Sequence, residues 1–484
     1  MLPYDNTNPA SIEAYAKKLI GKTFKQVYEE SLDLDFAIKD SNIDYSNPNQ
    51  KGNLGNLLEE CYFGYKANGE QEADFPEAEV ELKATCFDIL KNKKLSAGER
   101  LVLTMISFEE PVEKDFYQSH VWNKCKRILL IYYHRDKSLA YNTLYKIHYA
   151  NIVSPAKADL PIIINDYNKI IEKIESGRAH ELSESDTLYL GACTKGSTAA
   201  KSWRTQYYNP EVPARKRAFC FKRQYMDYIL HTYIVPDKTT YEPLIRDVSL
   251  LHEKSFEQII EERIEQYYGK TDKELCTIFD REYNNNKAQW TDLAYRMLGI
   301  KGNHAEEFQK ANIVVKVIRL EEDNSMNESI SFPAFKFKEL AEQEWEDSDV
   351  FEYFEETRFF YILFKRAGDC YRVHKCQFWN MPSDDLNETV KAGWEQVKDT
   401  IIDGVQFTIK ETKSGVIVKN NLLGKKDNRI IHIRPHASKA AYRLNSGFEI
   451  GKIDKDANEL PNGEYMTTQS FWINNSYILE QLGL

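Results

Sequence analysis

Several features that mark large classes of proteins are missing from this chain of 484 residues. No apolar run approaches the roughly 20 residues that a membrane-spanning helix needs, and the first residues show no cationic stretch followed by an apolar one, so we expect no membrane association and no secretion. The eight cysteines include no CxxC spacing, which argues against zinc and disulfides and favours a reduced cytoplasm. Positive charge is not in excess either. The formal net charge is −11, so any contact with nucleic acid must come from local basic clefts.

The most informative motif is a pair of carboxylates and a lysine in the arrangement D-x6-E-x-K, formed by Asp74, Glu81 and Lys83. If the end of this segment is a strand, Glu81 and Lys83 share one face, while Val80 and Leu82 point into a core. Asp74 precedes the strand and can reach the same face from a loop. Two carboxylates can bind a hard cation such as Mg²⁺, and a nearby lysine can orient water and stabilise charge on a phosphate. The motif therefore predicts phosphodiester hydrolysis, although an exposed strand with ordinary surface charges would carry the same residue types.

Three neighbouring segments strengthen this interpretation. Residues 51–64 predict a turn and a helix with one apolar stripe, and Glu59 flanks that stripe. Residues 119–127 carry Lys124 just before an apolar strand. Residues 215–223 interleave five basic residues with two phenylalanines, a composition that suits contact with DNA but is also common on solvated surfaces.

In this order, the motifs KGxxGxLLE, D-x6-E-L-K, SHVxxKxxR, YLxxxxK and a basic F-x-x-K resemble those of the MutH-type endonucleases, which recognise GATC in duplex DNA. The fuller similarity is to the two-lobed restriction endonucleases of the Sau type, and it covers nearly the whole chain. This resemblance implies an α/β fold with a mixed central sheet flanked by helices. It also implies Mg²⁺ as cofactor, double-stranded DNA as partner, and a type II enzyme of a restriction–modification system that cuts at GATC.

The resemblance assigns roles to the residues of the first half. Asp74 and Glu81 would hold one or two Mg²⁺ ions with help from Glu59. Lys83 would orient the attacking water, and Lys124 would support the phosphate or the nucleophile.

We expect a second group of residues to contact DNA. Lys195, next to Gly196, would read a guanine edge, because lysine can donate to O6 and N7 in the major groove. Phe219, Cys220 and Lys222 would line the adjacent reading loop.

The two halves of the chain align as an internal repeat. The lysine of the motif aligns with Lys316, the second carboxylate with Val314, and the helix glutamate with Ala294. Because valine and alanine cannot ligate a cation, the second copy is expected to be degenerate and without catalytic activity.

Arg434, Pro435 and His436 in the second copy resemble the DNA-reading loop of MutH-type proteins more closely than the corresponding residues of the first copy do. We therefore expect the second lobe to bind another GATC copy as an allosteric effector, the behaviour of a type IIE enzyme. A purely structural second lobe, whose arginine pairs with an acid, is the competing interpretation.

The expected organisation is a catalytic domain at 1–235, a linker at 236–250 that contains two prolines, and a DNA-binding domain at 251–484. We expect a monomer in solution, with dimerisation on DNA left open. Two other functions stay open at this point. One is a strand-nicking repair endonuclease, against which the second lobe argues. The other is a catalytically dead GATC-binding protein, against which the complete set of acids and lysines argues.

Overall fold

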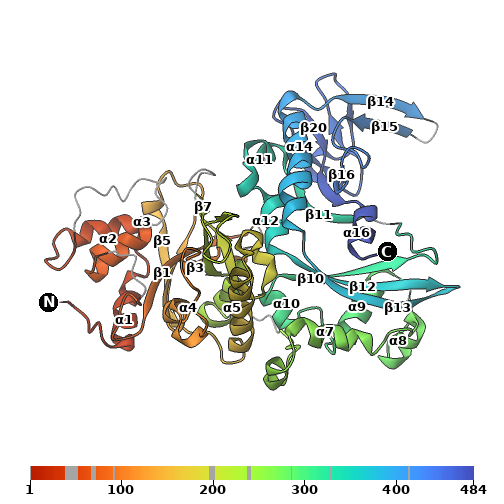
Figure 1. Ribbon diagram of the computed structural model, residues 1–484. Coiled ribbons are helices and arrows are strands. Elements are labelled where there is room, and N and C mark those ends of the chain that lie inside the picture. Colours follow the sequence, from red (N-terminus) through yellow and green to blue (C-terminus); the bar gives the residue numbers. More distant parts are fainter. Residues whose placement is uncertain are drawn as a thin grey trace. The chain divides into compact units, whose positions relative to one another are not determined.

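The computed structural model describes residues 2–38, 53–66, 72–90, 93–195, 202–236, 241–284, 286–327, 329–412 and 415–484 (Figure 1). The chain forms two compact units. The first contains Met1–Ile259 and Gly302–Ile313, and the second contains Ile260–Lys301 and Val314–Leu484. This division differs from the expected boundary at 236–250, because residues 251–259 and 302–313 also belong to the first unit.

Buried polar contacts explain why residues 302–313 belong to the first unit. Both carboxylate oxygens of Glu307 accept backbone N–H groups, from Leu244 and Ile245, each at 2.8 Å. The ammonium group of Lys310 lies 2.6 Å from the carboxylate of Asp159, and both side chains are almost fully buried. Buried charges of this kind are stable only when paired, so this return segment is fixed to the first unit.

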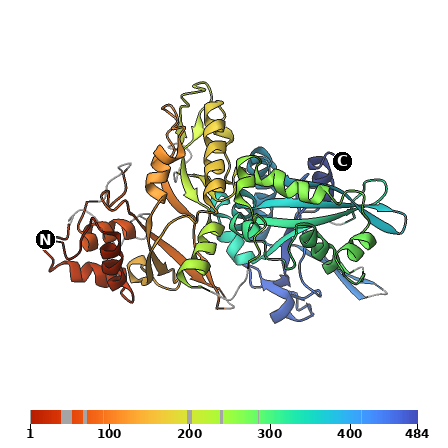
Figure 2. The same cartoon turned by 90° about the horizontal axis from the view of Figure 1, so that it is seen from below.

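One four-stranded sheet of the first unit has the order β2-β1-β4-β5, in which β1 is parallel to β4 and β4 is antiparallel to β5. The apolar stripe predicted for residues 51–64 packs against this sheet, since Leu54, Leu57, Leu58 and Cys61 share one core with Leu82 and Leu129. Figure 2 shows the N-terminal helices grouped beside this sheet. The elements are β1 (Glu81–Ile89), β2 (Leu95–Ala97), β4 (Ile128–His134), β5 (Lys146–Val153), α1 (Pro9–Ala16), α2 (Phe24–Ser31) and α3 (Asn53–Leu57).

A three-stranded antiparallel sheet of the order β3-β9-β6 completes the first unit together with a short hairpin, β7-β8. The strands of the sheet are β3 (Leu101–Met105), β6 (Leu190–Thr194) and β9 (Arg217–Phe221). The strands of the hairpin are β7 (Trp203–Arg204) and β8 (Ala214–Arg215). The helices are α4 (His120–Cys125), α5 (Leu160–Glu175), α6 (Arg223–Ile229) and α10 (Glu306–Lys310).

The second unit repeats this strand order. Its sheets β10-β12-β13 and β11-β21-β16 correspond to β1-β4-β5 and β3-β9-β6, with the same succession along the chain. The pairs β12–β13, β11–β21 and β16–β21 are antiparallel, as are their counterparts. The topology therefore confirms the internal repeat inferred from the sequence. The strands are β10 (Ile313–Leu320), β11 (Ile330–Phe335), β12 (Arg358–Ala367), β13 (Cys370–Trp379), β16 (Ile431–Pro435) and β21 (Gln469–Ile473).

The remaining elements surround these sheets. The helices are α7 (Phe256–Glu265), α8 (Asp272–Ile278), α9 (Lys287–Met297), α11 (Phe337–Glu342), α12 (Asp349–Glu356), α13 (Ser383–Asp385), α14 (Lys391–Asp403), α15 (Ile453–Asp456) and α16 (Asn475–Gln481). The strands are β14 (Phe407–Thr412), β15 (Gly415–Asn420), β17 (Tyr442–Arg443), β18 (Glu449–Ile450), β19 (Ala457–Glu459) and β20 (Tyr465–Thr467). Across the described part of the chain, no helix has both the length and the apolar character needed to cross a membrane.

Candidate active site

A tight turn before β1 brings the two carboxylates of the motif together. Phe75 and Val80 form a β-bridge across the turn, so Asp74 and Glu81 lie next to each other at its open end. The backbone N–H of Asp74 donates to Glu81 Oε2 at 3.2 Å, and the N–H of Leu82 donates to Asp74 Oδ2 at 2.8 Å. The backbone thereby fixes both acids, and Asp74 reaches Glu81 from the turn before the strand.

Two lysines meet at Glu81, whose side chain is only 1% exposed. Lys83 Nζ lies 2.7 Å from Glu81 Oε1, which confirms that residues 81 and 83 share a face of β1. Lys124 Nζ lies 3.0 Å from Glu81 Oε2. Lys124 reaches this point because Ser119 caps α4 and β4 pairs in parallel with β1. The predicted Lys83 and Lys124 therefore converge on one carboxylate.

Glu59 enters the site from the continuation of α3, where Leu58–Phe63 form a π-helical turn. Such turns often occur at functional sites, since they change the direction of a side chain within a helix. The turn ends at Gly64, which has φ +78°, and a Cβ there would lie 2.9 Å from the carbonyl oxygen of Phe36. Glycine is thus required where this helix stops.

The three acids repel one another in a buried setting. Burial, reinforced by the charge of Asp74, raises the pKa of Glu59 to about 7. Burial and the charge of Glu81 raise the pKa of Asp74 to about 6. Burial alone would lower the pKa of Lys83, but the charge of Glu81 and the hydrogen bond to it prevail and raise that pKa. The site therefore holds more negative charge than its lysines compensate.

This donor set fits a hard divalent cation. The ligand atoms are carboxylate oxygens, which Mg²⁺ and Ca²⁺ prefer, and a cation would relieve the repulsion that raises the two pKa values. Asp74, Glu81 and Glu59 are the residues that would hold it.

Tyr65 is a member of this site that the sequence did not reveal. Its hydroxyl is buried and has no hydrogen-bond partner among the described residues. Burial and the charges of Asp74 and Glu59 raise the pKa of that hydroxyl well above its ordinary value. A tyrosine directly after a helix-ending glycine carries no sequence signal for such a position.

Comparison with known proteins agrees with this geometry. A family model described as the DNA mismatch repair enzyme MutH matches residues 63–166, a range that contains Asp74, Glu81, Lys83 and Lys124. The type II restriction enzyme Sau3AI of Staphylococcus aureus is 36% identical over 462 residues, which cover 89% of this chain and 92% of that enzyme. The chain belongs to the MutH-like type II restriction endonucleases. It is therefore a site-specific deoxyribonuclease, and the geometry above describes how a member of this family arranges its acids and lysines.

The residues predicted to read DNA in the first unit divide into two groups. Lys195 follows β6 and is partly exposed, with its N–H donating to the carbonyl oxygen of Lys216 at 2.8 Å. Gly196 lies outside the described residues.

The second group is buried, contrary to the prediction of a reading loop. Phe219 and Cys220 lie in β9, the central strand of its sheet, and are 6% and 0% exposed. Lys222 is 3% exposed and donates to the carbonyl oxygen of Thr187. These side chains are inaccessible to DNA in this structure, because other side chains cover the faces of the sheet, as the ring of Tyr167 does where it stacks on Phe219 with 5.5 Å between centroids.

Partly exposed cationic side chains occur on the neighbouring hairpin. The guanidinium of Arg215 in β8 lies 5.6 Å from the ring centroid of Trp203 in β7, and Trp203 is 45% exposed. In the second unit, the predicted Arg434, Pro435 and His436 are all exposed at the end of β16. Arg434 lies 4.8 Å from the ring centroid of Trp472. Each unit thus presents an arginine stacked on a tryptophan.

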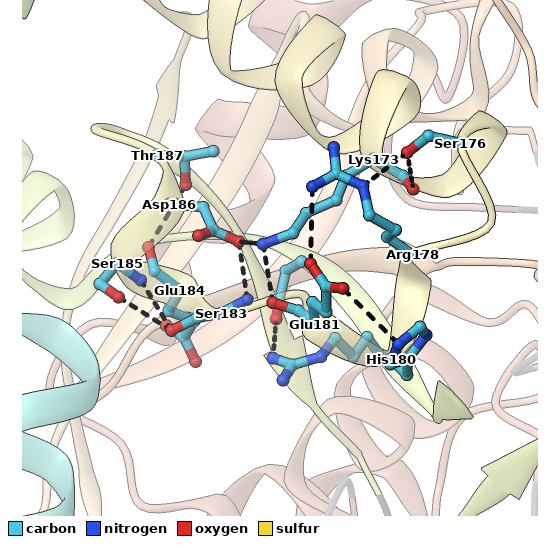
Figure 3. Close-up of polar contacts among 12 residues, drawn as sticks. Lys173, Ser176, Arg178, His180, Glu181, Ser183, Glu184, Ser185, Asp186 and Thr187 are labelled. Atoms are coloured by element: carbon cyan, nitrogen blue, oxygen red, sulfur yellow. Dashed lines mark hydrogen bonds and ion pairs between the residues drawn. The ribbon is translucent and has the colours of Figure 1, made fainter. Parts of the chain in front are cut away.

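A polar network holds the segment between α5 and β6 that leads to Lys195 (Figure 3). Lys173 Nζ donates to the carbonyl oxygen of Glu181 at 2.7 Å and contacts Asp186 Oδ2 at 2.9 Å. The same Asp186 oxygen accepts the N–H of Ser183 at 2.8 Å. These contacts fix the segment that precedes β6.

The raised pKa values predict that cation binding depends on pH. Asp74 and Glu59 are protonated below about pH 6 and pH 7, so a cation must displace their protons there. Affinity for Mg²⁺ in the absence of DNA should rise with pH and level off above pH 7, changing about tenfold per pH unit for each displaced proton. Calorimetric titrations from pH 5 to pH 8 measure this.

The control for this titration is Glu79→Gln, which alters an exposed glutamate beside the site and should leave the profile unchanged. Glu59→Gln should remove the part of the rise near pH 7. An affinity that does not change between pH 5 and pH 8 would contradict the arrangement.

Proposed function

We propose that the protein is a Mg²⁺-dependent restriction endonuclease that hydrolyses both strands of duplex DNA at GATC. The observation that carries this proposal is the junction at Glu81, where Asp74, Lys83 and Lys124 meet. The GATC target is supported by the sequence motifs that resemble those of the MutH-type endonucleases.

The residues of the junction divide the work of hydrolysis. Asp74 and Glu81, with Glu59 beside them, would hold Mg²⁺, which supplies Lewis-acid stabilisation of the phosphate when bound. Lys83 is placed to orient an attacking water, since its ammonium contacts Glu81 and its side chain remains 25% accessible, whereas that of Glu81 is 1% accessible. Lys124 is more deeply buried and is suited to hold Glu81 and to support the charge that develops on the phosphate.

For the second unit, we propose that it binds a second GATC copy and thereby stimulates cleavage. Arg434 is exposed and stacked on Trp472, so its guanidinium is preorganised to donate to a base edge. His436 is fixed beside it by a contact between its Nδ1 and Ser470 Oγ at 3.2 Å. Val314 and Ala294 in place of the acids leave this unit without the ligands for hydrolysis.

Loss of the central carboxylate tests the chemistry. Glu81→Gln removes the charge that holds the cation and both lysines, so cleavage of GATC plasmids should fall by at least about 10³-fold. Binding of GATC duplex should be retained, because Glu81 contacts no phosphate. Glu79→Gln, two residues away and exposed, should cut normally. Cleavage by Glu81→Gln at close to the wild-type rate would show that the active site lies elsewhere.

Loss of the stacked arginine tests the second unit. Wild-type protein should cut a two-site plasmid faster than a one-site plasmid, and added GATC duplex should stimulate the one-site reaction. Arg434→Ala should raise the duplex concentration needed for half-maximal stimulation by about 5- to 150-fold, the equivalent of ~1–3 kcal/mol for a bidentate base contact. Arg443→Ala, which removes an exposed arginine paired with Glu449, should behave as wild type. Equal rates on both plasmids, with no stimulation, would exclude an effector role.

A further inference from the structure

Two cysteines and a glutamate that the proposals above do not use meet at the sheet β3-β9-β6. Within the described part of the chain, Glu184, Cys193 and Cys220 are buried, and one ligand atom from each lies within 4.8 Å of the other two. Cysteine sulfur and glutamate oxygen are both ligands of Zn²⁺, and in a tetrahedral site with bonds of about 2.0–2.3 Å they lie roughly 3.5–4 Å apart. Small movements of these side chains would therefore close them around an ion.

Strand pairing brings the two thiols together. The register of β6 against β9 makes Cys193 and Cys220 diagonal neighbours on one face of the sheet. Glu184 comes from a short 3₁₀ turn before β6 (Figure 3), and its Oε2 lies 4.0 Å from Cys220 Sγ. The prediction against zinc rested on CxxC spacing, which detects ligands close along the chain and misses those that strands assemble.

The charges around the cluster are compatible with a bound cation. The hydrogen bond with Cys220 lowers the pKa of Cys193, against the effect of burial, and the charge of Arg100 acts in the same direction. Arg100 also forms an ion pair with Glu184. Two thiolates and a carboxylate carry one more negative charge than a divalent ion neutralises, and Arg100 is placed to balance that charge. Lys222, whose charge acts on Cys220, is itself held by a backbone carbonyl.

We propose that Glu184, Cys193 and Cys220 bind a thiophilic divalent cation such as Zn²⁺, at a site separate from the Mg²⁺ site at Glu81. Both sulfurs and one carboxylate oxygen join the ion, and the remaining thiol protons are released to solvent. The ion ties β6 and β9 to the segment that precedes β6, so it stabilises the sheet whose strand β6 leads to Lys195. This role is structural and takes no part in hydrolysis.

Cobalt substitution in the full chain tests the site independently of DNA cleavage. Reduced protein is freed of metal by chelation, placed in excess Mg²⁺ to compete for the carboxylate site, and titrated with Co²⁺. Thiolates, which are soft ligands, give Co²⁺ a charge-transfer absorption in the near ultraviolet that carboxylates do not give. This absorption should saturate at about one Co²⁺ per chain, and Zn²⁺ should remove it by displacement.

Variants assign the ligands. Cys193→Ala and Cys220→Ala should each lose the absorption at the Co²⁺ concentration that saturates wild type, and Glu184→Gln should weaken Co²⁺ binding by at least about tenfold. Cys276→Ala, which removes a buried thiol of the second unit outside the cluster, should equal wild type. Circular dichroism checks that each variant is folded. No absorption in wild type, or full absorption in both folded cysteine variants, would overturn the proposal.

X-ray absorption of wild-type protein loaded with one Zn²⁺ in excess Mg²⁺ gives a test that needs no variant. The proposal requires two sulfur ligands at about 2.3 Å, with oxygen at about 2.0–2.2 Å. A first shell of oxygen or nitrogen alone would overturn the site, whatever the cleavage activity of the protein.

Discussion

The buried carboxylate of Glu81 is the centre on which the catalytic unit depends. An isolated charge at this depth would be strongly destabilising, and three separate elements converge to compensate it. The turn before β1 supplies the N–H of Asp74, β1 supplies Lys83, and α4 supplies Lys124. The parallel pairing of β1 with β4 brings the last of these into reach. The turn, the strand and the helix therefore all contribute groups to the same carboxylate.

The two units show how one topology can be kept while its chemistry changes. Both have the same succession of strands in their sheets. In the first unit, the face of β1 carries an acid and a lysine that neutralise each other. In the second, the corresponding face of β10 has lost the acid and kept the lysine, with Val314 and Lys316 at these positions. This loss of the acid results from the substitution of single side chains at equivalent positions, and it needs no change of fold.

Much of the active site could be predicted from the sequence, because its residues obey local periodicities. Strand alternation places Glu81 and Lys83 on one face, and the helical stripe ending at Cys61 buries the helix that carries Glu59. The prediction for Phe219, Cys220 and Lys222 was wrong about accessibility, since a basic segment with aromatic residues suits a DNA surface and a buried central strand equally well. The short apolar run in β9, bounded by cations, is typical of the latter. The position of Tyr65 depends on contacts between distant segments, which periodicity does not contain.

Cleavage of a plasmid that carries GATC sites, with and without Mg²⁺, tests the central claim most directly. If the first unit hydrolyses both strands through the acids and lysines at Glu81, wild-type protein should convert supercoiled plasmid to linear fragments that end at GATC. This conversion should occur only when Mg²⁺ is present. Products that stop at nicked circles, cutting that does not require Mg²⁺, or uncut plasmid to which the protein stays bound would contradict the account.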